Sequence, residues 1–278
     1  MIKKIFRYIC KIHNTSIYKQ KICLNLKTCI KKDMRKFFIA AITTAMLTAT
    51  AAIAQIPQNY YSSLKGKKGA ELKTAVHNII KNATVLKYGS GSGRTWEGFY
   101  TTDRLDDGQV VDRYSNDKRY FGNKGQAVSG MNIEHSFPKS WWGGSENQAY
   151  KDLYNLMPSE QKINSAKSNY PMGKVNNAST DNGCTKVGTG SNGYKLWEPA
   201  DKWKGDFARG YMYMATAYQD FTWSGTQALQ ILQQGDYPTL REWAYTLYIE
   251  WAKTDDVDQT EVERNNEVYK IQATAIRL

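Results

Sequence analysis

Three residues of this chain have types that together could hydrolyse a phosphodiester bond. Glu134 and His135 are adjacent, and Asn164 follows further along the chain. A histidine with an ordinary pKa of about 6.5 can take a proton from water at neutral pH. A divalent cation must also neutralise charge on the phosphate, and Mg²⁺ prefers carboxylate and amide oxygens. We therefore interpret His135 as a candidate base, and Glu134 and Asn164 as candidate metal ligands.

These residues can act together only if the intervening chain brings them to one place. Residues 152–157 (DLYNLM) alternate in the manner of a short strand, and the following PSEQ segment is typical of a helix start with Ser159 as its N-cap. Asn164 would then lie about one turn into that helix. In a regular strand Glu134 and His135 would point to opposite faces, so we expect a twist or a bulge there.

The N-terminal segment indicates export. Residues 37–54 are apolar, follow an Arg-Lys pair and end in Ala-Ile-Ala, a pattern that signal peptidase accepts. We interpret residues 34–54 as a signal peptide, and residues 1–33 as an over-extended gene model because Met34 supplies the expected start. A transmembrane anchor is the alternative, but the Ala/Thr-rich composition and the lack of basic residues directly afterwards favour cleavage before Gln55. The protein is then expected to be periplasmic or secreted.

Removing this leader changes what the composition implies. The whole chain has a formal net charge of +12, but 11 of its 38 Lys/Arg and one of its 26 Asp/Glu lie in residues 1–54. The remaining 27 basic and 25 acidic residues give +2, so total charge does not indicate nucleic-acid binding. Three of the four cysteines also leave. Cys184 stays as an ordinary free thiol in residues 176–193, whose composition is that of an exposed loop.

Residues 55–278 are expected to form a single, mainly helical α+β domain. Apolar residues recur at helical spacing in residues 69–83, and residues 84–130 have the composition of loops and short strands. Further helical segments, whose Tyr, Trp and Met side chains we assign to the core, are residues 205–221, 226–234, 238–253 and 257–272.

Several short motifs, in this order and spacing, resemble the secreted endonuclease I family. They are EH at 134–135, PKSW at 138–141, DLYNLMPS at 152–159, IN at 163–164 and KSNYP at 167–171. Residues 197–218 and 263–272 also resemble helices of that family. The resemblance implies a ββα-metal (His-Me) finger embedded in a mainly helical domain.

Carried over to this chain, the resemblance implies His135 as general base and Glu134 and Asn164 as ligands of one Mg²⁺. Asp152 and Asn155 would brace the second strand of the finger. Such enzymes cut DNA, and often RNA, with little sequence preference and leave 5′-phosphate ends. This activity fits contacts to the nucleic-acid backbone rather than to bases.

Four basic residues are candidates for phosphate contacts: Lys139, Lys151, Lys167 and Arg209. The alternative for each is an ordinary solvated lysine or a salt-bridged arginine. Two positions depart from the family: Tyr154 stands where relatives commonly have His, and Lys167 replaces an Arg that could bind phosphate in bidentate fashion. We expect reduced rather than absent activity. Relatives also usually continue as QGNRNPFID where this chain reads QATAIRL, so we hypothesise a truncation or frameshift after Gln272.

The resulting hypothesis is a secreted, Mg²⁺-dependent, sequence-nonspecific endonuclease. We expect a monomer with DNA and also RNA as substrates, no stable protein partner, and no membrane association after cleavage. One alternative is a non-catalytic exported protein that binds nucleic acid or glycan through its aromatic residues. A zinc peptidase is a weaker alternative, because residues 55–278 contain no HExxH motif and only His77 and His135 as histidines.

Overall fold

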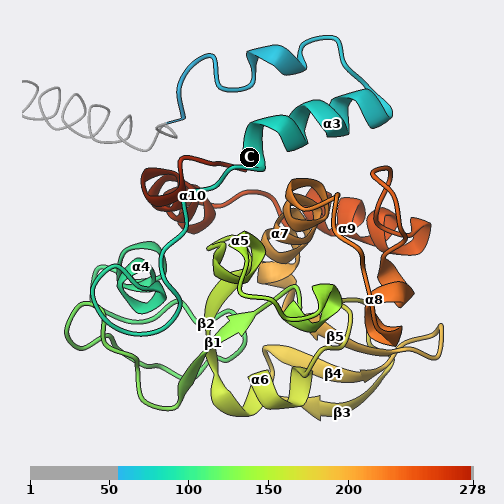
Figure 1. The fold of residues 1–278 in the computed structure, drawn as a ribbon. Helices are drawn as coiled ribbons and strands as arrows, with labels where there is room; N and C mark the ends of the chain where they lie inside the picture. Colours follow the sequence, from blue (N-terminus) through green and yellow to red (C-terminus); the bar gives the residue numbers. More distant parts are fainter. Residues whose placement is uncertain (1–55, 277–278) are drawn as a thin grey trace, which may run out of the picture. The chain divides into compact units, whose positions relative to one another are not determined.

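Helix α7 (Lys204–Ala217) is the element against which much of the chain packs. Phe207, Tyr211 and Met214 recur at helical spacing, and each is at most 1% exposed, which confirms their assignment to the core. Helices α9 (Glu242–Thr254) and α3 (Gly69–Ile80) pack against α7. In Figure 1 these three helices lie above the strands.

The computed structural model describes residues 56–276, and its architecture is α+β and mainly helical, as expected. The proposed signal peptide (34–54) and the segment before it (1–33) lie outside these residues. Among residues 56–276, no helix combines the length and apolar character needed to cross a membrane. The remaining helices are α4 (Thr95–Thr102), α5 (Gln148–Lys151), α6 (Gln161–Lys167), α8 (Thr226–Ile231) and α10 (Gln259–Gln272), with 3₁₀ turns η1 (Ser62–Leu64), η2 (Lys139–Trp142) and η3 (Asp201–Trp203).

Helix α4 lies in a region for which the sequence predicted only loops and short strands. Its Trp96 and Phe99 are buried, and α10 packs against it. Gly98 in the middle of α4 lowers its local helix propensity. A Cβ there would come within 2.8 Å of Leu86 Cδ1, so the glycine permits close packing. Tertiary contacts therefore stabilise a helix that local propensity does not favour.

Within residues 56–276, five strands form two separate antiparallel sheets. β1 (Met131–His135) pairs with β2 (Leu156–Glu160), and β3 (Asn177–Asp181), β4 (Thr185–Thr189) and β5 (Lys195–Pro199) follow each other in a three-stranded sheet. The prediction of an exposed loop at residues 176–193 was therefore wrong. Small polar residues give these strands no apolar alternation, and their order comes from pairing between strands.

The environment of Cys184 also differs from the prediction. Its thiol is 3% exposed and lies 3.6 Å from the carbonyl oxygen of Arg113. Burial raises the pKa of this thiol to about 11, so the reactive thiolate is scarce at neutral pH. Nearby, a Cβ on Gly188 would lie 2.1 Å from the carbonyl oxygen of Asn177, so glycine is needed for β3 to approach β4.

Candidate active site

Strands β1 and β2 and helix α6 form a continuous strand–loop–strand–helix unit, which we call the finger. The β1–β2 ladder is regular: Glu134 lies opposite Met157, and His135 lies opposite Leu156. The bulge that we expected as one way to bring Glu134 and His135 to the same face is thus not present, and the two side chains point to opposite faces of β1. His135 is the last residue of β1, and α6 follows β2 without a connecting loop.

The boundaries within the finger differ from those predicted. Strand β2 begins at Leu156, because the Asp152 side chain accepts the Tyr154 N–H at 2.9 Å and holds the preceding residues in a turn. Ser159 is the fourth residue of β2 and fully buried, rather than an N-cap. Helix α6 instead begins at Gln161, with no side-chain cap. Strand pairing here outweighs the local preference of serine for a helix cap.

His135 is held in a defined orientation by the chain around it. Its Nε2 lies 2.9 Å from the carbonyl oxygen of Tyr150. A carbonyl can only accept a hydrogen bond, so Nε2 carries the hydrogen and Nδ1 keeps a free lone pair in the neutral ring. The Tyr88 ring stacks on His135 with centroids 5.7 Å apart, and the Tyr150 ring contacts it edge-on at 4.4 Å. His135 is thus oriented as a proton acceptor.

The electrostatic surroundings keep His135 neutral. Burial, opposed in part by the hydrogen bond to Tyr150 and assisted by the positive charges of Lys139 and Lys167, lowers the pKa of His135 to about 4. The imidazole is therefore unprotonated at neutral pH, which is the state that a general base requires.

Glu134 lies on the other side of β1 and is paired with a lysine from α6. Glu134 is 5% exposed and Lys167 is fully buried, and their Oε1 and Nζ atoms are 2.7 Å apart. Burial raises the pKa of the Glu134 carboxyl, although the ammonium of Lys167 opposes this effect. Lys167 is therefore an internal counter-ion in this structure. It does not lie at the surface, where the sequence analysis expected a phosphate contact.

Asn164 lies one helical turn before Lys167 in α6, so both residues occupy the same face of that helix. Asn164 is half-buried. An amide oxygen and a carboxylate are ligand types that Mg²⁺ prefers, so the chemistry of Asn164 and Glu134 fits such an ion. Within the same residues, no group of three or more His, Cys, Asp or Glu side chains could hold a metal ion.

The candidate phosphate contacts fall into two groups. Lys139 is exposed, and its ammonium lies 3.1 Å from the Tyr150 hydroxyl; Lys151 is half-buried. Arg209, in contrast, is buried and makes two 2.6 Å hydrogen bonds to the carboxylate of Glu261. Like Lys167, it serves an internal ion pair in this structure and is not free to bind a phosphate.

Asp152 and Asn155 hold the connection between the two strands. Asp152 is fully buried, and its carboxylate accepts hydrogen bonds from the hydroxyls of Tyr213 and Tyr218 and from the Gln272 amide. Burial raises the pKa of Asp152 despite these donors. The Asn155 side chain accepts the N–H of Phe137 at 2.8 Å, just after His135. These contacts fix the turn before β2 relative to the end of β1.

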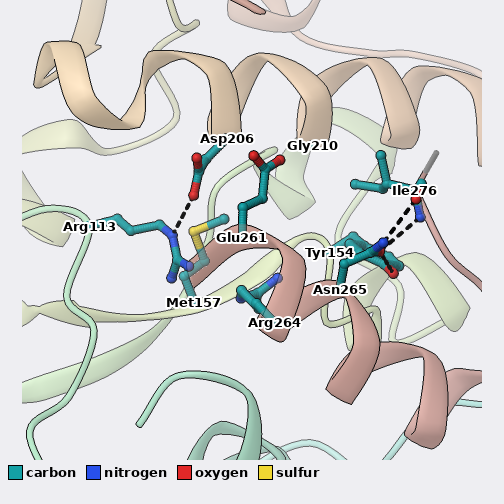
Figure 2. A pocket seen from close by; sticks show the side chains of 9 residues that line it. All are labelled: Arg113, Tyr154, Met157, Asp206, Gly210, Glu261, Arg264, Asn265 and Ile276. Atoms are coloured by element: carbon teal, nitrogen blue, oxygen red, sulfur yellow. Dashed lines mark hydrogen bonds and ion pairs between the residues drawn. The ribbon is translucent and has the colours of Figure 1, made fainter. Parts of the chain in front are cut away.

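Residues of α10 and Ile276 line a small pocket of about 30 Å³, together with Tyr154 and with Met157 of β2 (Figure 2). The Tyr154 hydroxyl lies within hydrogen-bond distance of Asn265 Oδ1 and of the carbonyl oxygen of Thr274. Asn265 in turn exchanges two hydrogen bonds with the backbone of Ile276. Tyr154 is thus occupied by interior contacts, and the segment after Gln272 packs into the structure up to the last described residue.

A buried charge network lies beside the same pocket. Asp103 accepts hydrogen bonds from Arg113 at 2.7 Å and from Arg264 at 2.8 Å. Burial alone would raise the pKa of Asp103, but the two guanidinium groups outweigh it and hold that pKa below its ordinary value. Arg264 also donates to the carbonyl oxygens of Leu153 and Leu156. This network links α4 and α10 to the start of β2.

Two residues that contact His135 were not identified from the sequence. Tyr88 comes from the irregular chain after α3, and Tyr150 acts through its backbone carbonyl as well as its ring. Tyr88 precedes the glycine-rich segment 89–93, and this composition could have drawn attention to it. No sequence signal marks the carbonyl of Tyr150, because every residue has one.

Comparison with known proteins identifies the family of this chain. Residues 68–275 match the family described as Endonuclease I. The chain belongs to the endonuclease I family. It is 30% identical to an extracellular ribonuclease of Bacillus subtilis (strain 168) over 234 residues, which cover 81% of this chain and 75% of that protein. It is 29% identical to an extracellular ribonuclease of Bacillus amyloliquefaciens over 222 residues, or 77% of this chain and 71% of that protein. The endonuclease I match thus spans the finger and the helices around it.

Proposed function

We propose that this endonuclease I protein is a secreted, Mg²⁺-dependent nuclease that hydrolyses phosphodiester bonds within DNA and RNA without sequence preference. The observation that carries the proposal is the neutral imidazole of His135, whose free Nδ1 lies on the same finger as Glu134 and Asn164. The two curated relatives named extracellular ribonucleases support export and the inclusion of RNA among the substrates.

In the proposed reaction, Nδ1 of His135 takes a proton from a water molecule as the water oxygen attacks the phosphorus atom. The bond between phosphorus and the 3′ oxygen breaks, and that oxygen leaves and acquires a proton from solvent. The products carry a 5′-phosphate and a 3′-hydroxyl, and His135 returns its proton to water. A bound Mg²⁺ would neutralise charge on the phosphate and on the leaving oxygen.

The rest of the finger serves this step by fixing positions. The Tyr150 carbonyl holds the tautomer and orientation of His135, and the Tyr88 ring limits rotation of the imidazole. A substrate phosphate beside His135 raises the affinity of the imidazole for a proton, because negative charge favours the imidazolium. Lys139 is exposed close to His135 and is the proposed contact to the nucleic-acid backbone, with Lys151 as a second one.

A digestion assay tests the proposal. Purified protein is incubated with supercoiled plasmid DNA and with structured RNA, in Mg²⁺ and in EDTA. We expect Mg²⁺-dependent nicking and a loss of about 10²–10⁴-fold in His135→Ala. End-labelling should find 5′-phosphates. Activity that survives both EDTA and His135→Ala would contradict the assignment.

The second candidate, an exported protein that binds nucleic acid without cutting it, predicts a different result. Such a protein would retard labelled DNA or RNA in a gel at any Mg²⁺ concentration and leave its length unchanged. The orientation of His135 favours the nuclease, because binding alone requires no imidazole nitrogen held ready to accept a proton.

A further inference from the structure

Lys167 is in an unusual environment for a lysine. It is fully buried, whereas lysine side chains almost always keep the ammonium in water. The ammonium lies 2.7 Å from Glu134 Oε1 and 5.1 Å from the ring centre of Trp197 on β5. Neither Lys167 Nζ nor Glu134 Oε1 has a hydrogen bond in proper geometry within the described chain. The contact is therefore a buried ion pair between opposite charges.

The position of this ammonium relative to the finger is well defined. Lys167 ends α6, and Asn164 lies one turn earlier on the same face. The helix thus directs a fixed positive charge toward the carboxylate of Glu134 from the side that also carries Asn164. A buried charge of this kind is poorly screened by solvent.

We propose that Lys167 is a built-in counter-cation that weakens divalent-metal binding at Glu134 in the free protein. This inference rests on the proposed function, in which Glu134 is a metal ligand. Glu134 carries one negative charge, and Lys167 already neutralises it. A divalent ion at the same carboxylate adds two positive charges beside the ammonium, so like-charge repulsion opposes its binding.

The proposal predicts the direction of change in metal affinity when the charge is removed. Lys167→Gln keeps a polar side chain and removes the positive charge. Lys167→Arg keeps the charge and is the matched control. The probe is Mn²⁺, whose free concentration is followed by electron paramagnetic resonance and whose binding heat is followed by calorimetry, both without nucleic acid. The titrations are run at about pH 8, well above the ordinary pKa of a glutamate carboxyl.

We expect Lys167→Gln to bind Mn²⁺ at least about tenfold more tightly than the natural protein, and Lys167→Arg to bind within about twofold of it. The double variant Lys167→Gln with Glu134→Gln should not show this tighter binding of Mn²⁺. Equal or weaker binding in Lys167→Gln would overturn the proposal, because Lys167 would then position Glu134 for the metal rather than compete with it.

A measurement on the natural protein covers the case in which Lys167→Gln fails to fold. Lysine labelled with ¹³C at Cε gives one signal for Lys167, which is identified by its absence in Lys167→Arg. Saturating Mg²⁺ should shift that signal, because the ion changes the charge at Glu134. An unchanged signal at saturation would overturn the proposal.

The two proposals can fail separately. If Mn²⁺ binds the natural protein, is lost in Glu134→Gln, and does not bind more tightly in Lys167→Gln, only the role of Lys167 is wrong. If the natural protein and Lys167→Gln both bind no Mn²⁺, the metal site of the proposed function is wrong and the role of Lys167 falls with it.

Discussion

Lowering the pH tests the protonation state of His135, on which the proposed chemistry depends. The side chain is 6% exposed, and burial with the nearby positive charges lowers its pKa to about 4, from an ordinary value of about 6.5. Each tenfold change in proton affinity is worth about 1.4 kcal/mol, so protonating His135 in the folded site costs about 3 kcal/mol more than protonating a histidine in water. This extra cost is a property of the folded site, and unfolding removes it.

Nuclear magnetic resonance can measure this pKa directly. The Cε1–H signal of His135, assigned by its absence in His135→Gln, should stay in the neutral position down to about pH 5 and move only near pH 4. In Mg²⁺, kcat/KM should keep its value over the same range, since this ratio reports ionisations of the free enzyme. Titration of His135 near pH 6.5, with an acid limb of kcat/KM at the same pH, would refute the reasoning.

The same pKa has a consequence for stability, and its sign is fixed. A group whose pKa is lower in the folded than in the unfolded state stabilises the fold fully above its unfolded pKa. The contribution from His135 should therefore be complete above about pH 6.5 and disappear as the pH falls towards 4. Urea unfolding of His135→Gln should lack this part of the pH dependence, whereas an identical pH dependence would contradict a buried neutral histidine.

Three further substitutions give expected outcomes. Lys139→Ala should raise KM several-fold with little change in kcat and reduce the salt dependence of binding by about one charge, whereas the exposed lysine control Lys253→Ala should change neither. Asp152→Asn should destabilise the fold by about 2 kcal/mol or more in urea unfolding, because a buried acceptor of several hydrogen bonds becomes partly a donor. Ala273→Gly should stabilise the protein by about 1 kcal/mol, since Ala273 has φ 56° at the end of α10. The same change at Ala75, inside α3, should destabilise by about 0.5–1 kcal/mol, and equal signs at both positions would contradict the backbone explanation.

The long helices could be predicted from the sequence because their apolar residues recur at helical spacing. Only in a helix does this spacing place them on one buried face. Helices α3 and α10 lie within segments identified in this way, and α7 and α9 each extend one residue beyond theirs. The strands β3 and β4 could not be predicted, since small polar residues carry no comparable pattern. Their pairing depends on neighbouring strands and on a close approach at Gly188.

The candidate site, too, was predictable from the sequence only in part. The adjacency of Glu134 and His135 and the motif order were visible in the sequence, and so was the helix that carries Asn164. The environment of Lys167 was not, because a lysine reads as a surface residue until the position of β1 relative to α6 is known. The same holds for Arg209, whose partner Glu261 lies far along the chain.

The sequence by itself determined which chemical groups this protein has: one histidine beside one glutamate, an amide on the following helix, and the helical periodicity of the scaffold. Only the tertiary structure decided the state of those groups. The pKa of His135, the tautomer set by the Tyr150 carbonyl and the charge placed next to Glu134 all depend on burial and on partners from other elements. Local sequence cannot specify them, because electrostatic energies depend on distance in space and on exclusion of water, whatever the separation along the chain.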